Sequence, residues 1–314
     1  GRTSKRSRRA IVRAMFRTTI AWTLPWLLGC ARSEPPAHNV RAAGDDSSAL
    51  TRAPSARVVD TARRAERPME AAPRAAAETP TAAGPNELPP LAADEELATL
   101  AVAGFLDAVV SVPGGATAAR PVAVALHGNF DRPEWQCAVW RGVVGKSGFV
   151  LCPRGVARRD VPKSMERFEY QSGKAVEQEI DAGLAALSER FTGYVDVTAV
   201  VIIGFSLGAI YASPLVQKAP QRFPRVALIE GGQGSWTPGS ARAFAAAGGQ
   251  RLFIGCGQSA CLSQASSRAQ RLEKAGLPTR SGGAAKAGHT YDGEVAAAFA
   301  AAWPWFVEGD DRWR

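Results

Sequence analysis

Residues 204–208 have the sequence Gly-Phe-Ser-Leu-Gly and directly follow the apolar run at residues 199–203. A buried strand that runs into Gly-x-Ser-x-Gly and then into a helix-forming stretch predicts a strand, a tight turn and a helix. On such a turn Ser206 is held with its hydroxyl exposed at the N-terminus of the helix. The flanking glycines are needed because a Cβ would clash where the chain turns back. An ordinary strand-to-helix turn is the alternative, so the surrounding sequence has to decide.

Two further motifs lie where a serine hydrolase needs them. A second apolar run, residues 121–126, ends in His127-Gly128-Asn129, and His289 is the only histidine after Ser206. A serine hydroxyl requires an adjacent base, which we expect to be His289. The tetrahedral oxyanion requires two N–H donors, and we expect those of Asn129 and Leu207. Alternatively, the histidines are a strand-end residue and a surface residue without a catalytic role.

The segments expected to form strands and helices alternate along the chain, which predicts a mostly parallel sheet covered on both faces. The segment between residues 231 and 249 is too short for a large lid domain. The expected strands are 106–112, 121–126, 148–152, 197–203, 225–230, 251–255 and 278–282. The expected helices are 133–146, 174–190, 207–219, 239–247, 262–275 and 292–306.

The order of oxyanion loop, serine and histidine resembles that of the α/β-hydrolase superfamily, near small esterases of the phospholipase/carboxylesterase or polyester-depolymerase kind. The resemblance covers about residues 104–306 and is carried by residues 126–128, 204–208 and 288–289. It implies an α/β-hydrolase fold and a serine hydrolase that cleaves small or polymeric carboxylic esters without a cofactor or metal. A peptidase or amidase with the same triad is one alternative. A non-catalytic surface binding module on a decayed hydrolase fold is another.

The acid of the triad is not where the superfamily usually has it, because residues 256–261 after the strand 251–255 include no carboxylate. Glu230 and Glu273 are the only acids between Ser206 and His289. Glu273 belongs to a predicted helix, where we expect a solvated charge. Glu230 ends the preceding strand on the same rim as the serine, so we predict that it orients His289. The alternative is a carboxylate that only caps the next turn.

The N-terminal 30 residues have the pattern of a bacterial lipoprotein signal. They contain seven of the basic residues and no acid, and a short apolar stretch ends in Leu-Leu-Gly-Cys at residues 27–30. This box predicts cleavage before Cys30 and lipidation of that cysteine. Residues 7–13 also resemble a twin-arginine export motif, though Arg17 interrupts the stretch downstream of it. We therefore expect an exported protein, attached to the bacterial cell envelope through this lipid anchor only.

The rest of the chain divides at about residue 97. Residues 31–96 contain no aromatic residue and are rich in Ala, Pro, Arg, Ser and Glu, which predicts a disordered tether. Residues 97–314 are the expected hydrolase domain, which we expect to be monomeric. The formal net charge is +9, and removal of the signal leaves about +2. Together with the lack of a basic-aromatic stripe, this argues against nucleic-acid binding.

Besides Cys30, the chain has four cysteines, which fit an exported protein. We predict the disulfides Cys137–Cys152 and Cys256–Cys261, the second stiffening the loop in which the acid usually lies. Metal binding is the alternative, but two isolated pairs without nearby histidines make a poor site.

Two sets of side chains near the predicted rim have either a substrate role or a structural one. The insertion after Pro153 is basic, which suits either an acidic group on a substrate or a solvated loop; its basic residues are Arg154, Arg158, Arg159, Lys163 and Arg167. Trp135, Trp140 and Trp236 follow rim loops and either line a substrate pocket or pack in the core.

Overall fold

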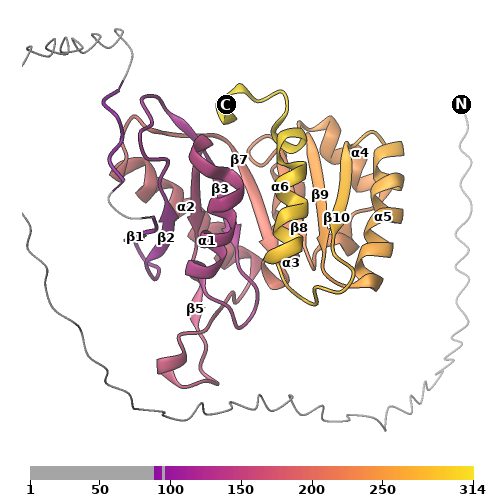
Figure 1. Ribbon diagram of the computed structural model, residues 1–314, viewed down its shortest axis with the longest axis horizontal. Coiled ribbons are helices and arrows are strands. Elements are labelled where there is room, and N and C mark those ends of the chain that lie inside the picture. Colours follow the sequence, from indigo (N-terminus) through magenta and orange to yellow (C-terminus); the bar gives the residue numbers. More distant parts are fainter. Residues whose placement is uncertain (1–87, 94–95) are drawn as a thin grey trace, which may run out of the picture. The chain divides into compact units, whose positions relative to one another are not determined.

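The computed structural model describes residues 88–93 and 96–314. The predicted signal, Cys30 and nearly all of the predicted tether lie outside these residues and stay predictions. Within the described residues an eight-stranded sheet has the order β1-β2-β4-β3-β7-β8-β9-β10 (Figure 1). Its strands are β1 (Ala98–Leu100), β2 (Ala108–Ser111), β3 (Arg120–Leu126), β4 (Phe149–Cys152), β7 (Val195–Phe205), β8 (Arg225–Ile229), β9 (Arg251–Cys256) and β10 (Thr279–Gly283).

In the sheet, each neighbouring pair of the series β4, β3, β7, β8, β9 and β10 is parallel. Strand β2 is antiparallel to β4, and β1 is antiparallel to β2. Six helices cover the sheet: α1 (Pro133–Val144), α2 (Gly173–Arg190), α3 (Leu207–Lys218), α4 (Pro238–Ala246), α5 (Ser259–Lys274) and α6 (Gly293–Val307). Short 3-10 turns are η1 (Gly145–Ser147), η2 (Lys163–Met165), η3 (Gln233–Ser235) and η4 (Asp311–Trp313). A separate hairpin consists of β5 (Val156–Ala157) and β6 (Phe168–Glu169).

The core lies on both faces of the sheet because successive residues of a strand point to opposite sides. Along β3, Val122 and Val124 pack into one buried cluster, whereas Ala123 and Ala125 pack into the other. Helices α2 to α5 supply the first cluster, and α1 and α6 supply the second. Burial on both faces explains why these strands are continuous apolar runs and do not alternate with polar residues.

This arrangement confirms the predicted fold class, an α/β-hydrolase fold without a large lid domain. All the expected strands and helices are present, with ends shifted by a few residues. Sequence analysis missed β1 and the β5–β6 hairpin, whose strands of two or three residues are too short for a periodic signal. The described part of the chain contains no helix that is both long and apolar enough to cross a bilayer.

Residues 88–93 lie against this fold, upstream of the expected domain start at residue 97. The N–H groups of Leu88 and Leu91 donate to the carbonyl oxygens of Thr117 and Ala116 at 2.8 and 2.9 Å. The hydroxyl of Tyr194 donates to the carbonyl oxygen of Pro89 at 2.6 Å. The last residues before the predicted boundary therefore add backbone hydrogen bonds to the domain.

Both predicted disulfides are present. Cys137 of α1 is bonded to Cys152 at the end of β4, and Cys256 at the end of β9 is bonded to Cys261 in α5. The first links a helix to the sheet, and the second closes a loop of the site.

Candidate active site

Ser206 lies in the turn between β7 and α3. It has φ 50° and ψ −112°, a backbone conformation that is strained for a residue with a side chain. Two residues later, a Cβ on Gly208 would strike the carbonyl oxygen of Leu126 at the end of β3. The glycine therefore lets the start of α3 approach the neighbouring strand, and the turn presents Ser206 at the carboxyl edge of the sheet, as predicted.

The structure brings the three predicted triad residues together from separate elements. Ser206 Oγ lies 2.9 Å from His289 Nε2, and His289 Nδ1 lies 3.1 Å from Glu230 Oε2. His289 belongs to the loop between β10 and α6, and its side chain is 49% exposed. Glu230 directly follows β8, and its side chain is 3% exposed. In one imidazole tautomer, therefore, His289 accepts a hydrogen bond from the serine hydroxyl while it donates one to a buried carboxylate.

The Glu230 carboxylate crosses from the end of β8 to the loop after β9. Its Oε1 accepts hydrogen bonds from the N–H of Gly257 and from the N–H of Gln258, the latter at 3.1 Å. Its Oε2 accepts from the Gln258 side-chain amide at 2.9 Å. Three donors from two consecutive residues thus fix the carboxylate, and the Cys256–Cys261 disulfide closes the loop that carries them.

Glu230, Cys256 and Cys261 also bring three potential metal-ligand atoms within 4.8 Å of one another. The two sulfur atoms are bonded to each other, so neither is a thiolate. A carboxylate already held by Gly257 and Gln258 is then the only conventional ligand of the group.

The two predicted oxyanion donors also lie at this rim. Within the described residues, the N–H groups of Asn129 and Leu207 have no protein acceptor. The two loops are joined because the N–H of Gly208 donates to the carbonyl oxygen of His127 at 3.1 Å. Free N–H groups on joined loops beside Ser206 are the arrangement that an oxyanion hole requires.

Asp131 shapes the oxyanion loop, a role that sequence analysis did not identify. This buried carboxylate accepts hydrogen bonds from the N–H of Gly128 at 3.3 Å and from the N–H of Arg132 at 2.8 Å. The hydroxyl of Tyr291, two residues after His289, donates to it at 3.3 Å. Asp131 therefore connects the loop of residues 127–131 to the loop that carries His289.

His127 is a structural residue of the oxyanion loop. Its ring is fully buried and stacks on Tyr170, with ring centroids 4.4 Å apart. Nδ1 lies 2.7 Å from the carbonyl oxygen of Gly128, and Nε2 lies 2.8 Å from that of Arg154. Burial lowers the pKa of His127 below its ordinary value, against the opposing effect of the two carbonyl groups.

The three tryptophans near the rim divide into two groups. Trp140 and Trp236 are 0% and 1% exposed and belong to the two core clusters, so they pack. Trp135, in the first turn of α1, is 45% exposed. Only Trp135 is accessible to a ligand.

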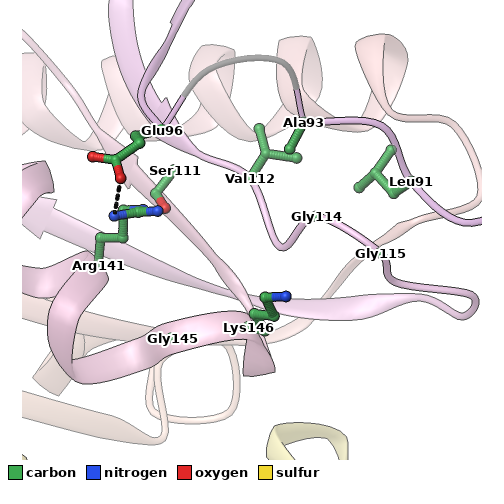
Figure 2. Close-up of a pocket in the computed structure, with 10 residues that line it drawn as sticks. All are labelled: Leu91, Ala93, Glu96, Ser111, Val112, Gly114, Gly115, Arg141, Gly145 and Lys146. Atoms are coloured by element: carbon green, nitrogen blue, oxygen red, sulfur yellow. Dashed lines mark ion pairs between the residues drawn. The ribbon is translucent and has the colours of Figure 1, made fainter. Parts of the chain in front are cut away.

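A cavity of about 650 Å³ lies away from these residues, lined by Leu91, Ala93 and Glu96, by the end of β2 and by the end of α1 (Figure 2). Arg141 projects into it and pairs with Glu96 at 3.3 Å, and Lys146 lies on the other side. Because α1 begins at the rim that carries Ser206, its last turn lies toward the opposite edge of the sheet. This cavity therefore contains no predicted site residue.

Comparison with known proteins finds similar folds among solved structures. No protein-family model matches the chain, and no curated protein matches its sequence. A Bacillus cereus carboxylesterase is 18% identical, with a TM-score of 0.44 over 65% of this chain and 94% of its own. A ferulic acid esterase is 14% identical, with a TM-score of 0.46 over 67% and 96%. A protein from Thermus thermophilus is 17% identical, with a TM-score of 0.45 over 68% and 100%.

The fold assignment rests on this chain's own strand order and on the turn at Ser206. Together they define a protein of the α/β-hydrolase fold with a Ser-His-Glu arrangement at the carboxyl edge of its sheet.

Proposed function

We propose that this protein is a serine hydrolase that cleaves carboxylic esters through an acyl-enzyme intermediate. One observation carries the proposal. The Ser206 hydroxyl, the His289 ring and the Glu230 carboxylate form a continuous hydrogen-bonded series, with distances of 2.9 and 3.1 Å. The buried glutamate stabilises the imidazolium that forms during the reaction. A histidine surrounded only by solvent would lack this stabilisation.

In the first half of the reaction, His289 Nε2 takes the proton of Ser206 as the serine oxygen attacks the ester carbonyl carbon. The carbonyl π electrons move to its oxygen, and the N–H groups of Asn129 and Leu207 stabilise the resulting oxyanion. The tetrahedral intermediate then collapses. The bond to the alcohol oxygen breaks, and His289 returns the proton to the leaving alcohol.

In the second half, His289 takes a proton from a water molecule that attacks the acyl-enzyme. A second oxyanion forms at the same N–H groups, and its collapse releases the carboxylic acid as Ser206 recovers its proton. The 49% exposed side chain of His289 is consistent with direct entry of water from solvent. The Glu230 carboxylate orients the ring by accepting a hydrogen bond from Nδ1–H.

A fluorophosphonate probe tests whether the serine is activated. We expect covalent labelling of the wild-type protein and its loss in Ser206→Ala, while Ser147→Ala, a serine of η1 away from the site, labels normally. Thermal unfolding of each variant checks that it is folded. If the wild-type protein is not labelled, the molecule is a binding module on a hydrolase fold and the proposal is wrong.

The substrate class is tested with p-nitrophenyl esters of graded chain length beside peptide p-nitroanilides. We expect kcat/KM to be higher for at least one ester than for every anilide, and turnover to disappear in Ser206→Ala. Faster turnover of the anilides would instead identify a peptidase or amidase that uses the same residues.

We further propose that the enzyme acts outside the cytoplasm, attached through lipid at Cys30. Two disulfides within the described residues support export, because such bonds persist mainly in oxidising compartments. The sequence at residues 27–30 supports the anchor. Globomycin, which blocks lipoprotein signal cleavage, should cause the precursor to accumulate, and Cys30→Ala should prevent incorporation of labelled palmitate. A fully processed Cys30→Ala protein would contradict the proposal.

A further inference from the structure

The β5–β6 hairpin is attached directly to the oxyanion loop. The N–H of Phe130 donates to the carbonyl oxygen of Phe168 at 3.1 Å, and the N–H of Phe168 donates to that of Asp131 at 3.0 Å. Arg158 of the same insertion donates to the side chain of Asn129, the predicted oxyanion residue. Side chains of the hairpin are therefore held beside the position that a substrate would occupy.

Arg167, just before β6, places its guanidinium over two exposed aromatic rings. Its guanidinium carbon is 5.4 Å from the ring centroid of Phe130 and 4.6 Å from that of Trp135. The two aromatic side chains are 43% and 45% exposed, which is unusual for residues of this size. The rings orient the guanidinium and remove part of its hydration, which strengthens its interaction with an anion.

Arg167 also differs from its neighbours in charge pairing. Arg158 pairs with Glu169 at 2.9 Å, and Arg132 pairs with Glu166 at 2.8 Å. Arg154 pairs likewise with Glu134. Arg167 has no carboxylate partner among the described residues, and its one hydrogen bond to protein is from Nη1 to the carbonyl oxygen of Met165 at 2.6 Å. Most of the N–H groups of the Arg167 guanidinium thus have no acceptor among the described residues.

The loop that carries Phe130 begins beside Ser206 in space. A Cβ placed on Gly128 would be 3.4 Å from the Cβ of Ser206, so the oxyanion loop starts in contact with the serine. Two residues later the chain reaches Phe130, at most about 7 Å further on. The Cα of Phe130 therefore lies within about 12 Å of Ser206 Cβ, a span that an extended substrate with its carbonyl at Ser206 can cross.

We propose that Phe130, Trp135 and Arg167 form a subsite for an anionic group of the substrate, and that the preferred substrates are esters that also carry a carboxylate. The inference rests on the proposed esterase function and specifies its substrate class. The guanidinium binds the carboxylate with its free N–H groups, and the two rings cover the adjacent apolar part of the substrate.

Matched pairs of esters test this subsite. One series compares p-nitrophenyl monoesters of dicarboxylic acids of increasing length with neutral p-nitrophenyl alkanoates of the same length. A second compares acetoxybenzoates with the corresponding acetoxybenzamides, so that the charge is on the alcohol side. In at least one series we expect the anionic ester to have the higher kcat/KM, and the preference to peak at one linker length.

Arg167→Gln should lower kcat/KM for the preferred anionic ester about tenfold or more, while the neutral ester changes less than about twofold. Arg167→Lys should fall between the two because it keeps the charge without the planar fork. Arg159→Gln is the matched control, since Arg159 is an exposed arginine of the same insertion without a ring contact. It should leave the anionic-to-neutral ratio unchanged.

A measurement on the wild-type enzyme does not depend on any variant. Raising the ionic strength should lower kcat/KM for the anionic ester and leave that of its neutral partner unchanged. If neutral esters are hydrolysed and neither Arg167→Gln nor salt alters the ratio, the subsite is wrong and the esterase function stands. If no ester of either kind is hydrolysed and the fluorophosphonate probe does not react, both proposals fail.

Discussion

At the scale of single residues, the position of the proposed triad acid departs most from what is usual in the superfamily. Glu230 follows β8, whereas the loop after β9 supplies Gln258 where a carboxylate is usual. The side chain of Glu230 is longer than that of an aspartate and reaches from the end of β8 to the loop after β9. There the Gly257 and Gln258 N–H groups fix it beside the His289 ring. The carboxylate and its support thus come from adjacent strands.

We predict that Glu230→Gln keeps the fold and lowers kcat by about 10³- to 10⁴-fold. The amide retains the shape of the carboxylate but supplies no negative charge opposite the imidazolium and favours the wrong histidine tautomer. Steady-state ester kinetics measure the effect, and Glu273→Gln, which removes a carboxylate from α5, serves as the control. Near-normal turnover in Glu230→Gln would exclude this residue from the mechanism.

A second prediction concerns pH and His127. Its pKa in the folded protein is below the ordinary value of 6.5 because the ring is buried. As the pH falls through 6.5, the unfolded chain binds a proton at this residue and the folded protein does not. The contribution of neutral His127 to the free energy of unfolding should therefore be fully present above about pH 6.5 and decrease as the pH falls toward the folded-state pKa.

Urea unfolding between pH 8 and pH 5 measures this slope. We expect the decrease below pH 6.5 to be smaller in His127→Gln, whose amide does not titrate. Comparison of the two proteins at each pH isolates His127 from the other titrating groups. An equal decrease in both would show that the buried imidazole does not control acid stability.

Ser206 and Glu230 were predictable from the sequence because each follows or ends an expected strand on one rim, and His289 because it is the only histidine after the serine. Sequence analysis did not identify Gln258 or Asp131. Both act through contacts with residues distant in sequence: Gln258 with Glu230, and Asp131 with Tyr291. Such partners depend on which loops the sheet order places together, and no local pattern encodes that order.

At the scale of elements, the loop from Cys256 to Cys261 is the support of the acid. It leaves β9, places two consecutive N–H groups at Glu230, and enters α5, while the disulfide joins its two ends. A crosslink over so few residues limits the conformations of the loop more than those of the whole chain. Its contribution should therefore be larger for catalysis than for global stability.

We predict that the double variant Cys256→Ser, Cys261→Ser lowers kcat by about tenfold or more and changes the melting temperature little, because Glu230 loses its fixed donors. The variant Cys137→Ser, Cys152→Ser should lower the melting temperature and change kcat little, since that bridge links α1 to β4 within the buried core. Ester kinetics and thermal unfolding of both variants test the contrast. Equal effects on kcat would contradict it.

At the scale of the whole molecule, the mostly parallel sheet was predictable and the attachment of residues 88–93 to it was not. Continuous apolar runs indicate strands buried on both faces, and their alternation with helices fixes a parallel sheet. Residues 88–93, with the sequence Leu-Pro-Pro-Leu-Ala-Ala, have no such pattern. They join the domain through backbone hydrogen bonds to residues 115–117, which composition does not reveal.

We predict that a shortened protein beginning at residue 88 has the melting temperature and ester turnover of the full chain. A protein beginning at residue 97 should keep the triad but melt several degrees lower, because it lacks the hydrogen bonds of Leu88 and Leu91. Differential scanning calorimetry beside ester kinetics compares the three. Loss of activity in the protein that begins at residue 88 would place part of residues 1–87 in the functional unit.

The backbone at Ser206 sets a limit on how stable this protein can become while it remains active. A residue with a side chain at φ 50° and ψ −112° costs on the order of 1–3 kcal/mol, and glycine would relieve most of that strain. A screen that selects for heat resistance alone should therefore favour Ser206→Gly, a variant that melts higher and hydrolyses nothing. Directed evolution of this enzyme must select for turnover and stability together.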